Sequence, residues 1–308
     1  MNKAIITGNS HPYLQEALAK NNYEVFYAPE ISYEELMAQA NDITGLILTT
    51  RIKVDKALID AAPNLQWIGR LGSGMELVDV PYAESKGIKC VSSPEGNRNA
   101  VAEHSLGMLL ALLNRIVVSS QEVKQFVWKR NANRGHELTG KTVGIIGFGN
   151  TGSTFARLLQ PFNVTVLAYD KYKTDFAKDF VKEASLEQVC KYSDVISFNV
   201  PLTPITNQML NSTLIEQMEQ SPIIINASRG KVINTAHIIE GLKQNKLSGA
   251  CLDVLENEKL DTFTDEQKAQ LQWLSNQENV IVTPHIAGYS HEAFLKMVTV
   301  TLEKLGLQ

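Results

Sequence analysis

The chain has 308 residues, of which 44% are hydrophobic and 20% are charged, an ordinary composition for a globular protein long enough for about two domains. Its net charge of −4 gives no reason to expect nucleic acid or an anionic membrane as a partner. No apolar stretch approaches the roughly 20 residues that span a bilayer, and the apolar run near the N-terminus is too short for a signal peptide, so we expect a cytoplasmic protein.

Short runs rich in Val and Ile alternate with helical patterns in the first hundred residues. The predicted strands are 3–8, 23–28, 45–50, 66–72 and 88–93, and the predicted helices between them are 11–20, 32–40 and 54–62. The strands are apolar almost throughout, which is typical of parallel strands covered on both faces. The alternation therefore predicts a doubly wound α/β fold.

The pattern changes at residues 99–128, which we predict to form one long, buried helix. The alternation then resumes with predicted strands at 141–147, 164–170, 194–201, 222–228, 249–255 and 279–284. Residues 256–273 are polar and are expected to form an exposed excursion. An amphipathic helix at 291–308 closes the chain, with Leu295, Val298 and Leu302 on one face.

Four glycines fall within "GIIGFGNTG", between the strand 141–147 and a helical pattern at 150–162. This context fits a dinucleotide-binding turn. There Gly147 permits the tight turn, Gly149 lets a pyrophosphate approach the backbone, and Gly152 lets the helix pack close to the strand. The helix N-terminus offers unpaired N–H groups to the phosphates. A glycine-rich turn without a ligand is the alternative.

The second strand of this region should end at Asp170, where a carboxylate can accept hydrogen bonds from the ribose hydroxyls of the cofactor. Its charge would repel a 2′-phosphate, so we expect NAD rather than NADP as the cofactor. Lys171 weighs against this preference, because its ammonium group could reach such a phosphate.

The motifs "INASRG", "CLDVLENE" and "VTPHIAG" lie at the ends of predicted strands and carry Arg229, then Asp253 with Glu258, and His285. The carboxyl ends of parallel strands surround the ligand crevice of a doubly wound sheet, so Arg229, Glu258 and His285 are expected to converge. Taken singly, each of these three has a structural alternative: a surface cation, a solvated loop charge and a core histidine.

With these motifs and with "GRLGSGMELVDV", "NAVAEHSLGMLLAL", "NVPLTPITNQML" and "NASRGKVIN", the sequence resembles the D-isomer-specific 2-hydroxyacid dehydrogenases from about Gly45 to the last helix. The resemblance implies interconversion of a small D-2-hydroxy acid and its 2-oxo acid. It implies a catalytic set of Arg229, Glu258 and His285.

The chemistry of these side chains agrees with that set. An imidazole is the natural acid in reduction and base in oxidation. A carboxylate at its other nitrogen, here Glu258, would orient the ring and favour its charged form. Arg229 can hold a carboxylate with two hydrogen bonds and polarise the carbonyl group, which a lysine does less well.

The resemblance also implies ligand contacts. Those expected at the cofactor are Gly147, Gly149, Asn150, Thr151, Gly152, Asp170, Val200, Pro201, Thr206, Ala227 and Asp253, the last near the nicotinamide amide. Those expected at the substrate are Arg70, Ser73, Gly74, Arg229 and His285, with the backbone of Ser73 and Gly74 at its carboxylate.

The family's fold implies a Rossmann NAD-binding domain at 99–285 inserted in a flavodoxin-like substrate domain at 1–98 plus 286–308. Family members are typically dimers through the long helix and the arm around Trp128 and Arg130, so we expect a homodimer. The sequence ends after its closing helix, and we expect no C-terminal regulatory domain.

Three features bear on the substrate. Phosphoglycerate dehydrogenases of the family carry an arginine where Thr49 stands, although Arg51 and Arg70 lie nearby. Met75, Glu76 and Leu77 replace the more usual Val-Asp-Asn, and Lys259 replaces a proline after Glu258. Phosphoglycerate in serine biosynthesis, glycerate or hydroxypyruvate, and other small 2-oxo acids therefore stay open. Formate dehydrogenases place glutamine at Glu258, which argues against them.

A non-catalytic NADH-binding protein, like the corepressors of this family, is the alternative to an enzyme. The remaining titratable residues give no second site. We interpret the cysteines as buried small hydrophobes, with a catalytic thiol as the alternative, and the other histidines as structural or surface residues without metal-ligand spacing. These residues are Cys90, Cys190, Cys251, His11, His104, His136, His237 and His291.

Overall fold

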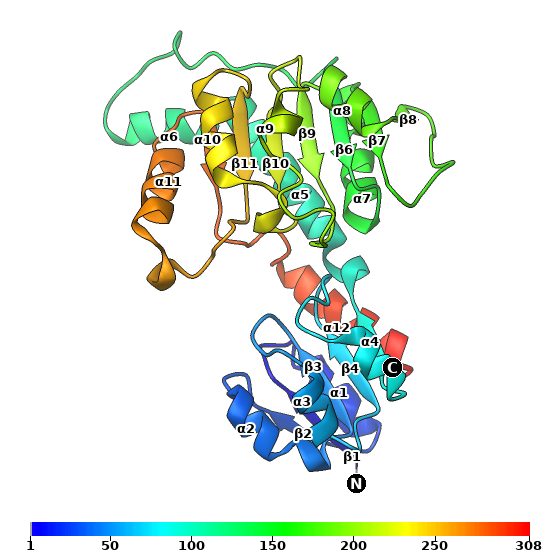
Figure 1. Cartoon of the computed structure of the whole chain (residues 1–308). Coiled ribbons are helices and arrows are strands. Elements are labelled where there is room, and N and C mark those ends of the chain that lie inside the picture. Colours follow the sequence, from blue (N-terminus) through cyan, green and yellow to red (C-terminus); the bar gives the residue numbers. More distant parts are fainter. Residues whose placement is uncertain (1) are drawn as a thin grey trace. The chain divides into compact units, whose positions relative to one another are not determined.

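The computed structural model describes residues 2–308, which divide into two compact units. Unit 1 comprises residues 2–98 and Tyr289–Gln308, and unit 2 comprises Asn99–Gly288. Each contains one parallel sheet with helices on both faces (Figure 1). The predicted α/β class with two doubly wound parallel sheets is confirmed.

Unit 1 has a five-stranded sheet in the order β2-β1-β3-β4-β5. Its strands are β1 (Asn2–Ile6), β2 (Tyr23–Tyr27), β3 (Gly45–Leu48), β4 (Trp67–Arg70) and β5 (Lys89–Ser92). Its helices are α1 (Tyr13–Lys20), α2 (Tyr33–Ala38), α3 (Lys56–Ala61), α4 (Val80–Ser85) and α12 (His291–Leu305), with a 3₁₀ turn at Ala40–Asp42. This is the flavodoxin-like order that the family resemblance implies.

Two apolar layers hold unit 1 together, because alternate residues of each strand face opposite sides of the sheet. Ile5 and Leu46 pack on the side of α2, α3 and α4, whereas Ile6 and Ile47 pack on the side of α1 and α12. Helix α12 contributes Met297, Val298 and Leu302 to the second layer. The last segment of the chain thus completes the core of the first.

Unit 2 has a seven-stranded sheet in the order β12-β11-β10-β9-β6-β7-β8. Its strands are β6 (Thr142–Ile146), β7 (Thr165–Tyr169), β8 (Val181–Glu183), β9 (Val195–Phe198), β10 (Ile223–Asn226), β11 (Gly249–Leu252) and β12 (Val280–Val282). Its helices are α6 (Ile116–Lys124), α7 (Asn150–Leu159), α8 (Leu186–Tyr192), α9 (Ser212–Ile215), α10 (Thr235–Lys243) and α11 (Asp265–Ser275), with 3₁₀ turns at Gln160–Phe162, Gly230–Val232 and Leu260–Thr262. Helix α5 (Pro94–Leu113) begins in unit 1 and runs into unit 2.

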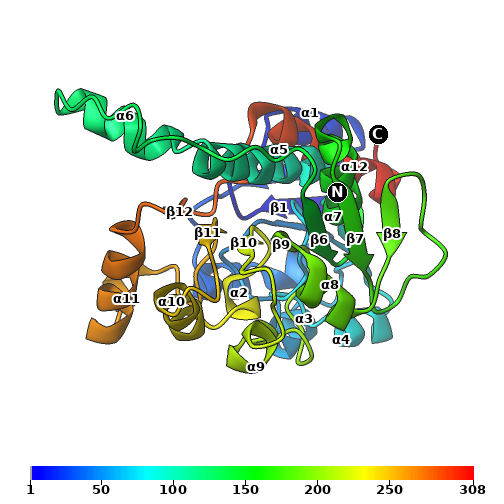
Figure 2. The ribbon, with the colours of Figure 1, turned by 90° about the horizontal axis from the view of Figure 1, so that it is seen from above.

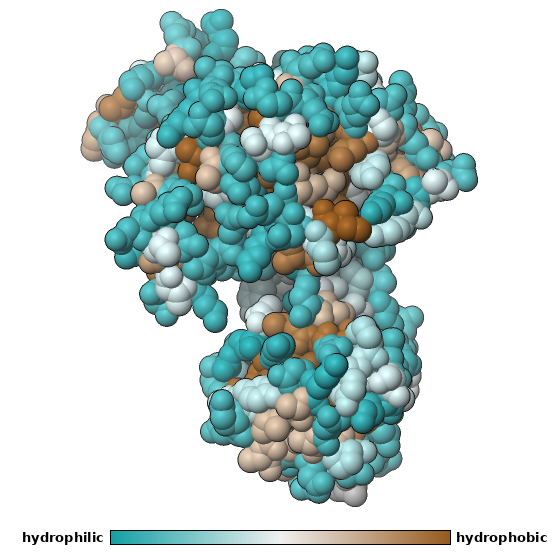
Figure 3. Space-filling model, viewed as in Figure 1, coloured by the Kyte–Doolittle hydropathy of each residue, from teal (hydrophilic) through white to brown (hydrophobic). Residues whose placement is uncertain are grey.

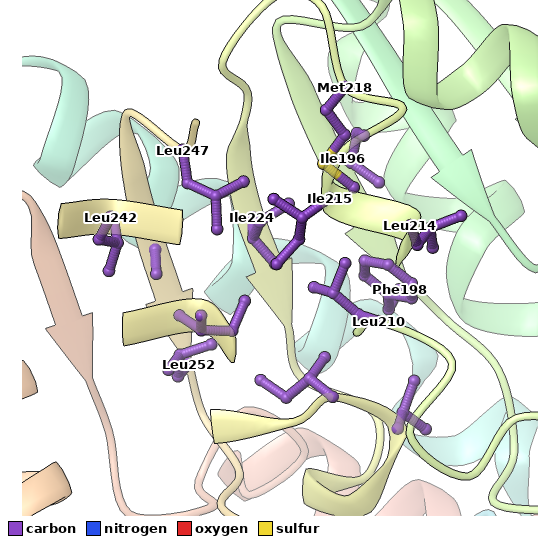
Figure 4. Packing of buried hydrophobic residues seen from close by; sticks show 14 of the residues in the cluster. Ile196, Phe198, Leu210, Leu214, Ile215, Met218, Ile224, Leu242, Leu247 and Leu252 are labelled. Carbon is purple, nitrogen blue, oxygen red and sulfur yellow. The ribbon is translucent and has the colours of Figure 1, made fainter. Parts of the chain in front are cut away.

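The two faces of this sheet are covered by different helices. Helices α5 and α7 cover one face and α8, α9 and α10 the other (Figure 2). On the second face the core joins buried side chains of the strands to those of the helices and connecting loops. Figure 4 shows Ile196, Phe198, Leu210, Leu214, Ile215, Met218, Ile224, Leu242, Leu247 and Leu252 packed together there.

The prediction of one buried helix over 99–128 is wrong. Helix α5 ends at Leu113 and α6 starts at Ile116 after a bend of 62°. The break is at Arg115, whose φ of 54° is left-handed and incompatible with a continuing helix. Helix α5 does enter the core with Ala102 and Leu109, but α6 has no buried residue.

Residues 256–273 are exposed or half-buried, as expected of an exposed excursion. The segment is nevertheless partly helical: Thr264 and Gln267 form a capping box that starts α11, and this helix is anchored by Leu274, which is fully buried. The strand β8 and the helices α4, α8, α9 and α10 also have no counterpart among the predicted segments.

Within residues 2–308, no single helix is long and apolar enough to cross a membrane. Taken as a bent pair, α5 and α6 do reach the required length and composition. The visible face of the molecule is mostly hydrophilic, with apolar side chains in small groups (Figure 3).

Candidate active site

The glycine-rich turn joins β6 to α7 at the point where strand order reverses, between β6 and β9. Gly147 has a φ of 93°, and a Cβ there would lie 2.5 Å from the Asn199 carbonyl oxygen. At Gly152 a Cβ would lie 2.0 Å from the Gly147 carbonyl oxygen. A Cβ at Gly149, by contrast, would meet nothing within 4 Å. Two glycines thus serve close packing, while the third leaves open space at the helix N-terminus, which fits an approaching pyrophosphate.

Asp170 directly follows β7 and binds the glycine-rich turn. One carboxylate oxygen accepts a hydrogen bond from Phe148 N at 2.8 Å. The other accepts from Tyr172 N at 2.9 Å and from Lys173 N at 3.1 Å. Lys173 Nζ in turn donates to the Phe148 carbonyl oxygen at 3.3 Å. The carboxylate therefore holds the glycine-rich turn in place. It also lies where the sequence predicts it, at the end of the second strand of the unit.

Four further residues expected at the cofactor lie in loops at the carboxyl ends of β9 and β10. Val200 and Pro201 follow β9, and the Thr206 hydroxyl closes their loop by donating to the Pro201 carbonyl oxygen at 2.6 Å. Ala227 follows β10 and is half-buried. Asn150 and Thr151 form the first turn of α7.

His285 and Glu258 are in contact. His285 Nδ1 lies 2.7 Å from Glu258 Oε2, and the side chains are 43% and 41% exposed. Because Nδ1 bonds to a carboxylate, it carries a proton, which leaves Nε2 to exchange one with a ligand. Within the described chain no group hydrogen-bonds to His285 Nε2.

The backbone of His285 is held in an uncommon conformation. Its φ is 56°, which costs about 1–3 kcal/mol in a residue other than glycine unless neighbours hold it. His285 N donates to the carbonyl oxygens of Asp253 (2.7 Å) and Thr283 (3.0 Å). The Asp253 carboxylate, only 1% exposed, accepts from Ile286 N at 2.9 Å and Ala287 N at 2.8 Å. The hydrogen bonds to Asp253 thus hold the turn that carries the imidazole.

The Arg229 loop is packed against the loop that leads to Glu258. A Cβ at Gly230 would lie 1.8 Å from the Leu255 carbonyl oxygen, so only glycine allows this contact. Asn226, fully buried, donates to the Arg229 carbonyl oxygen at 3.0 Å and accepts from Ser228 N at 3.1 Å. Arg229 Nη1 donates to the Ser228 carbonyl oxygen at 2.7 Å. The loop holding Arg229 is therefore internally braced.

The residues expected at the substrate carboxylate belong to unit 1. Ser73 Oγ donates to Asn97 Oδ1 at 3.1 Å. Gly72 has a φ of 134°, and a Cβ there would lie 1.5 Å from Arg70 Nη1, so the Arg70 side chain folds over this glycine. Gly74 follows directly. Arg51 forms an exposed ion pair with Glu30 at 3.0 Å.

The cysteines and the other titratable residues do not form a second reactive site among residues 2–308. Burial raises the pKa of the Cys190 thiol to about 11 and that of Cys251 further, which removes them as nucleophiles at neutral pH. Among residues 2–308, no group of three or more His, Cys, Asp or Glu side chains is placed to hold a metal ion.

Sequence reasoning gave His104 no role at the site, yet it contacts the Asp253 network. His104 Nε2 lies 3.1 Å from Thr283 Oγ1 and 3.6 Å from Asp253 Oδ1. His104 is on α5, and 179 positions separate it from Thr283, so no local motif could reveal the contact. Asn226 and Gly230 were missed as well, although both belong to the motif "NASRG".

Comparison with known proteins agrees with this geometry. Residues 106–287 match the NAD-binding domain of the D-isomer specific 2-hydroxyacid dehydrogenases. A hydroxypyruvate reductase of Thermotoga maritima is 35% identical over 88% of this chain and 87% of its own. A D-3-phosphoglycerate dehydrogenase of Archaeoglobus fulgidus is 33% identical over 96% of this chain. The match covers only 56% of the length of that relative. The D-lactate dehydrogenase of Aquifex aeolicus, solved with NAD and lactic acid, superposes with a TM-score of 0.86 at 27% identity, covering 99% of this chain and 94% of its own.

A doubly wound sheet with a dinucleotide-type glycine turn and a histidine–carboxylate pair at its strand ends defines the class of dinucleotide-dependent oxidoreductases. Within it, the chain belongs to the D-isomer-specific 2-hydroxyacid dehydrogenase family.

Proposed function

We propose that the protein is an NAD-dependent dehydrogenase that interconverts a small D-2-hydroxy acid and its 2-oxo acid. The observation that carries the proposal is the 2.7 Å contact between His285 Nδ1 and Glu258 Oε2 at the end of β12. A carboxylate on one nitrogen orients the ring and stabilises its protonated form, so the other nitrogen can deliver a proton.

The roles of the chain's own residues follow from this pair. His285 holds a proton at Nε2 and delivers it to the carbonyl oxygen of the 2-oxo acid, and it removes that proton in oxidation. Arg229 binds the substrate carboxylate and polarises the carbonyl group. The backbone of Ser73 and Gly74 is proposed to donate to the same carboxylate. Nicotinamide, when bound, supplies or accepts the hydride.

The glycine-rich turn and Asp170 are proposed to hold NAD. The open space at Gly149 and the N-terminus of α7 suit the pyrophosphate, and the Asp170 carboxylate suits the ribose hydroxyls. NADH should therefore outperform NADPH. Because Asp170 also holds Phe148 N, Asp170→Ala should weaken binding of both cofactors while it narrows the gap between them. Titration of each cofactor by fluorescence checks this, and a wild-type preference for NADPH would contradict it.

For the substrate, we propose an unphosphorylated 2-oxo acid such as hydroxypyruvate first. Arg51 is paired with Glu30, and Thr49 occupies the position of the family's phosphate-binding arginine. 3-Phosphohydroxypyruvate is the second candidate, favoured by the relatives named D-3-phosphoglycerate dehydrogenase. The test is a panel of 2-oxo acids followed by NADH absorbance. Steady NADH binding without turnover of any of them would favour the non-catalytic alternative.

We also propose a homodimer through α6 and the segment that follows it. Phe126 is 99% exposed and Trp128 is 82% exposed, and Ile116, Val117 and Val123 expose apolar surface beside them. Helix α6 projects beyond the sheet of unit 2 (Figure 2). Such a concentration of exposed large apolar side chains is typical of an interface. Sedimentation analysis of wild type and Trp128→Ser should show a dimer and a weakened dimer.

A further inference from the structure

The turn that presents His285 is connected to helix α5 by a chain of polar contacts that the proposed mechanism does not use. His104 Nε2, on α5, lies 3.1 Å from Thr283 Oγ1. Thr283 Oγ1 lies 2.5 Å from Asp253 Oδ1, and the Asp253 carboxylate accepts from the N–H groups of Ile286 and Ala287. All five residues belong to unit 2.

The direction of these hydrogen bonds follows from the donors and acceptors. A threonine hydroxyl has one proton, and the Asp253 carboxylate can only accept, so the Thr283 proton goes to Asp253. Thr283 Oγ1 must then accept from His104, whose Nε2 carries a proton. Each link therefore has one donor and one acceptor, and the chain ends on the two amides that follow His285.

The polar groups of this network are largely buried, so leaving one of them without a hydrogen-bond partner would lower the stability of the turn. Asp253 is 1% exposed, and the His104 side chain is 24% exposed. Loss of the His104 donor would leave Thr283 Oγ1 with only its contact to Asp253 and a 3.6 Å contact to Met108 Sδ. A partly satisfied buried network is weaker than a complete one, because each hydrogen bond polarises the next.

We propose that His104 is a positioning residue: through Thr283 and Asp253 it holds the left-handed turn at His285 and so aims the imidazole. The inference rests on the proposed function for its catalytic consequence, but not for its structural one. Among the described residues, neither a hydrogen bond nor an ion pair joins His104 to His285 or Glu258, so it acts through the backbone of the turn.

The first test is hydrogen exchange of the amides in the peptide containing residues 283–289. In His104→Phe, which keeps a ring but has no donor, this peptide should exchange about tenfold faster than in wild type. His104→Gln supplies an N–H donor and should restore most of the protection. Thr283→Val, which removes the hydroxyl at nearly constant shape, should reproduce the His104→Phe result. His291→Phe, an exposed histidine at the start of α12, is the matched control and should leave the peptide unchanged.

The second test is kinetic. His104→Phe should lower kcat for reduction of the best 2-oxo acid about tenfold while the Kd for NADH, measured by fluorescence, stays within twofold. The double variant with Thr283→Val should lose no more than either single variant, because both break one chain.

Three outcomes would overturn the proposal: unchanged exchange in His104→Phe, faster exchange spread over β6 and β9 as well, or additive losses in the double variant. If the wild type reduces none of the 2-oxo acids, the proposed function fails, and the exchange experiment alone still decides whether His104 holds the turn.

Discussion

In unit 1 the strand order reverses between β1 and β3, and in unit 2 it reverses between β6 and β9. Both first strands run into a glycine, Gly8 after β1 and Gly147 at the start of the glycine-rich turn. At Gly8 a Cβ would lie 2.1 Å from Thr49 Oγ1, so the Thr49 side chain fills the space. At Gly149 the space is open. The same topology thus offers a crevice twice, and the space that a Cβ would take is open at Gly149 of unit 2 but filled by Thr49 at Gly8.

The largest expected effect separates the histidines of the two units. His285→Ala should lower kcat for 2-oxo acid reduction by roughly 10²–10⁴-fold, because proton transfer by a positioned group contributes that much. His11→Ala, in the loop after β1, should change kcat less than threefold. Steady-state kinetics with NADH checks both. A His285→Ala enzyme with near-normal kcat would remove the proposed acid.

The next effect tests the open space at Gly149. Gly149→Val should raise the Kd for NADH by about tenfold or more, which is about 1.4 kcal/mol or more, because its side chain would occupy the space proposed for the pyrophosphate. The melting temperature should fall by only a few degrees, since a Cβ at this position meets nothing within 4 Å. Unchanged affinity for NADH would show that the pyrophosphate lies elsewhere.

A smaller effect is expected when the ion pair of the site loses its charge. The Glu258 carboxylate lies 2.7 Å from His285 Nδ1 and orients the imidazole. In Glu258→Gln the side chain keeps its size and one hydrogen bond but loses its charge, so kcat for 2-oxo acid reduction should fall about tenfold, because hydrogen bonds to charged groups are the stronger ones. Steady-state kinetics with NADH measures the loss, and the Kd for NADH should not change. A near-normal kcat would mean that Glu258 does not support the imidazole.

The smallest effect concerns Gly8. Gly8→Ala should lower the free energy of unfolding by about 1–3 kcal/mol, because its Cβ meets Thr49. Adding Thr49→Ala should restore part of the loss, since the closest contacts are to Thr49 Oγ1 and Cγ2. The Kd for NADH should not change in either variant. Denaturant unfolding and fluorescence titration test the two halves of this expectation, and a changed Kd would contradict the assignment of cofactor binding to unit 2.

The sequence predicted most strands because parallel strands buried on both faces are apolar throughout. It missed β8, whose three residues "VKE" show no such pattern. It also missed the end of α5, because in "LLNRIVV" apolar residues resume at Ile116 directly after Arg115, where the helix breaks. Helix α11 had a readable signal in Thr264 and Gln267, its capping box, but its polar surface concealed it.

At the site, too, residues with a local sequence signal were predicted and residues without one were missed. His285 and Glu258 were predicted together because both follow strands, and strand ends in a parallel sheet share one edge. His104 lies on a helix, among apolar residues that pack in the core. The sequence around it does not show whether its side chain makes a polar contact or faces solvent. Contacts between a helix and a distant turn depend on tertiary packing, which no local pattern records.

The split make-up of unit 1 determines the order in which the protein takes shape during translation. Its first 98 residues leave the ribosome early, yet Met297, Val298 and Leu302, which close one side of its core, are made last. Unit 2 is continuous from Asn99 to Gly288 and has all its strands before then. Nascent chains usually mature from the N-terminus. Here the core of unit 1 stays incomplete until α12 has been synthesised, and until then the apolar side chains of β1, β3 and α1 on that side of the sheet are uncovered.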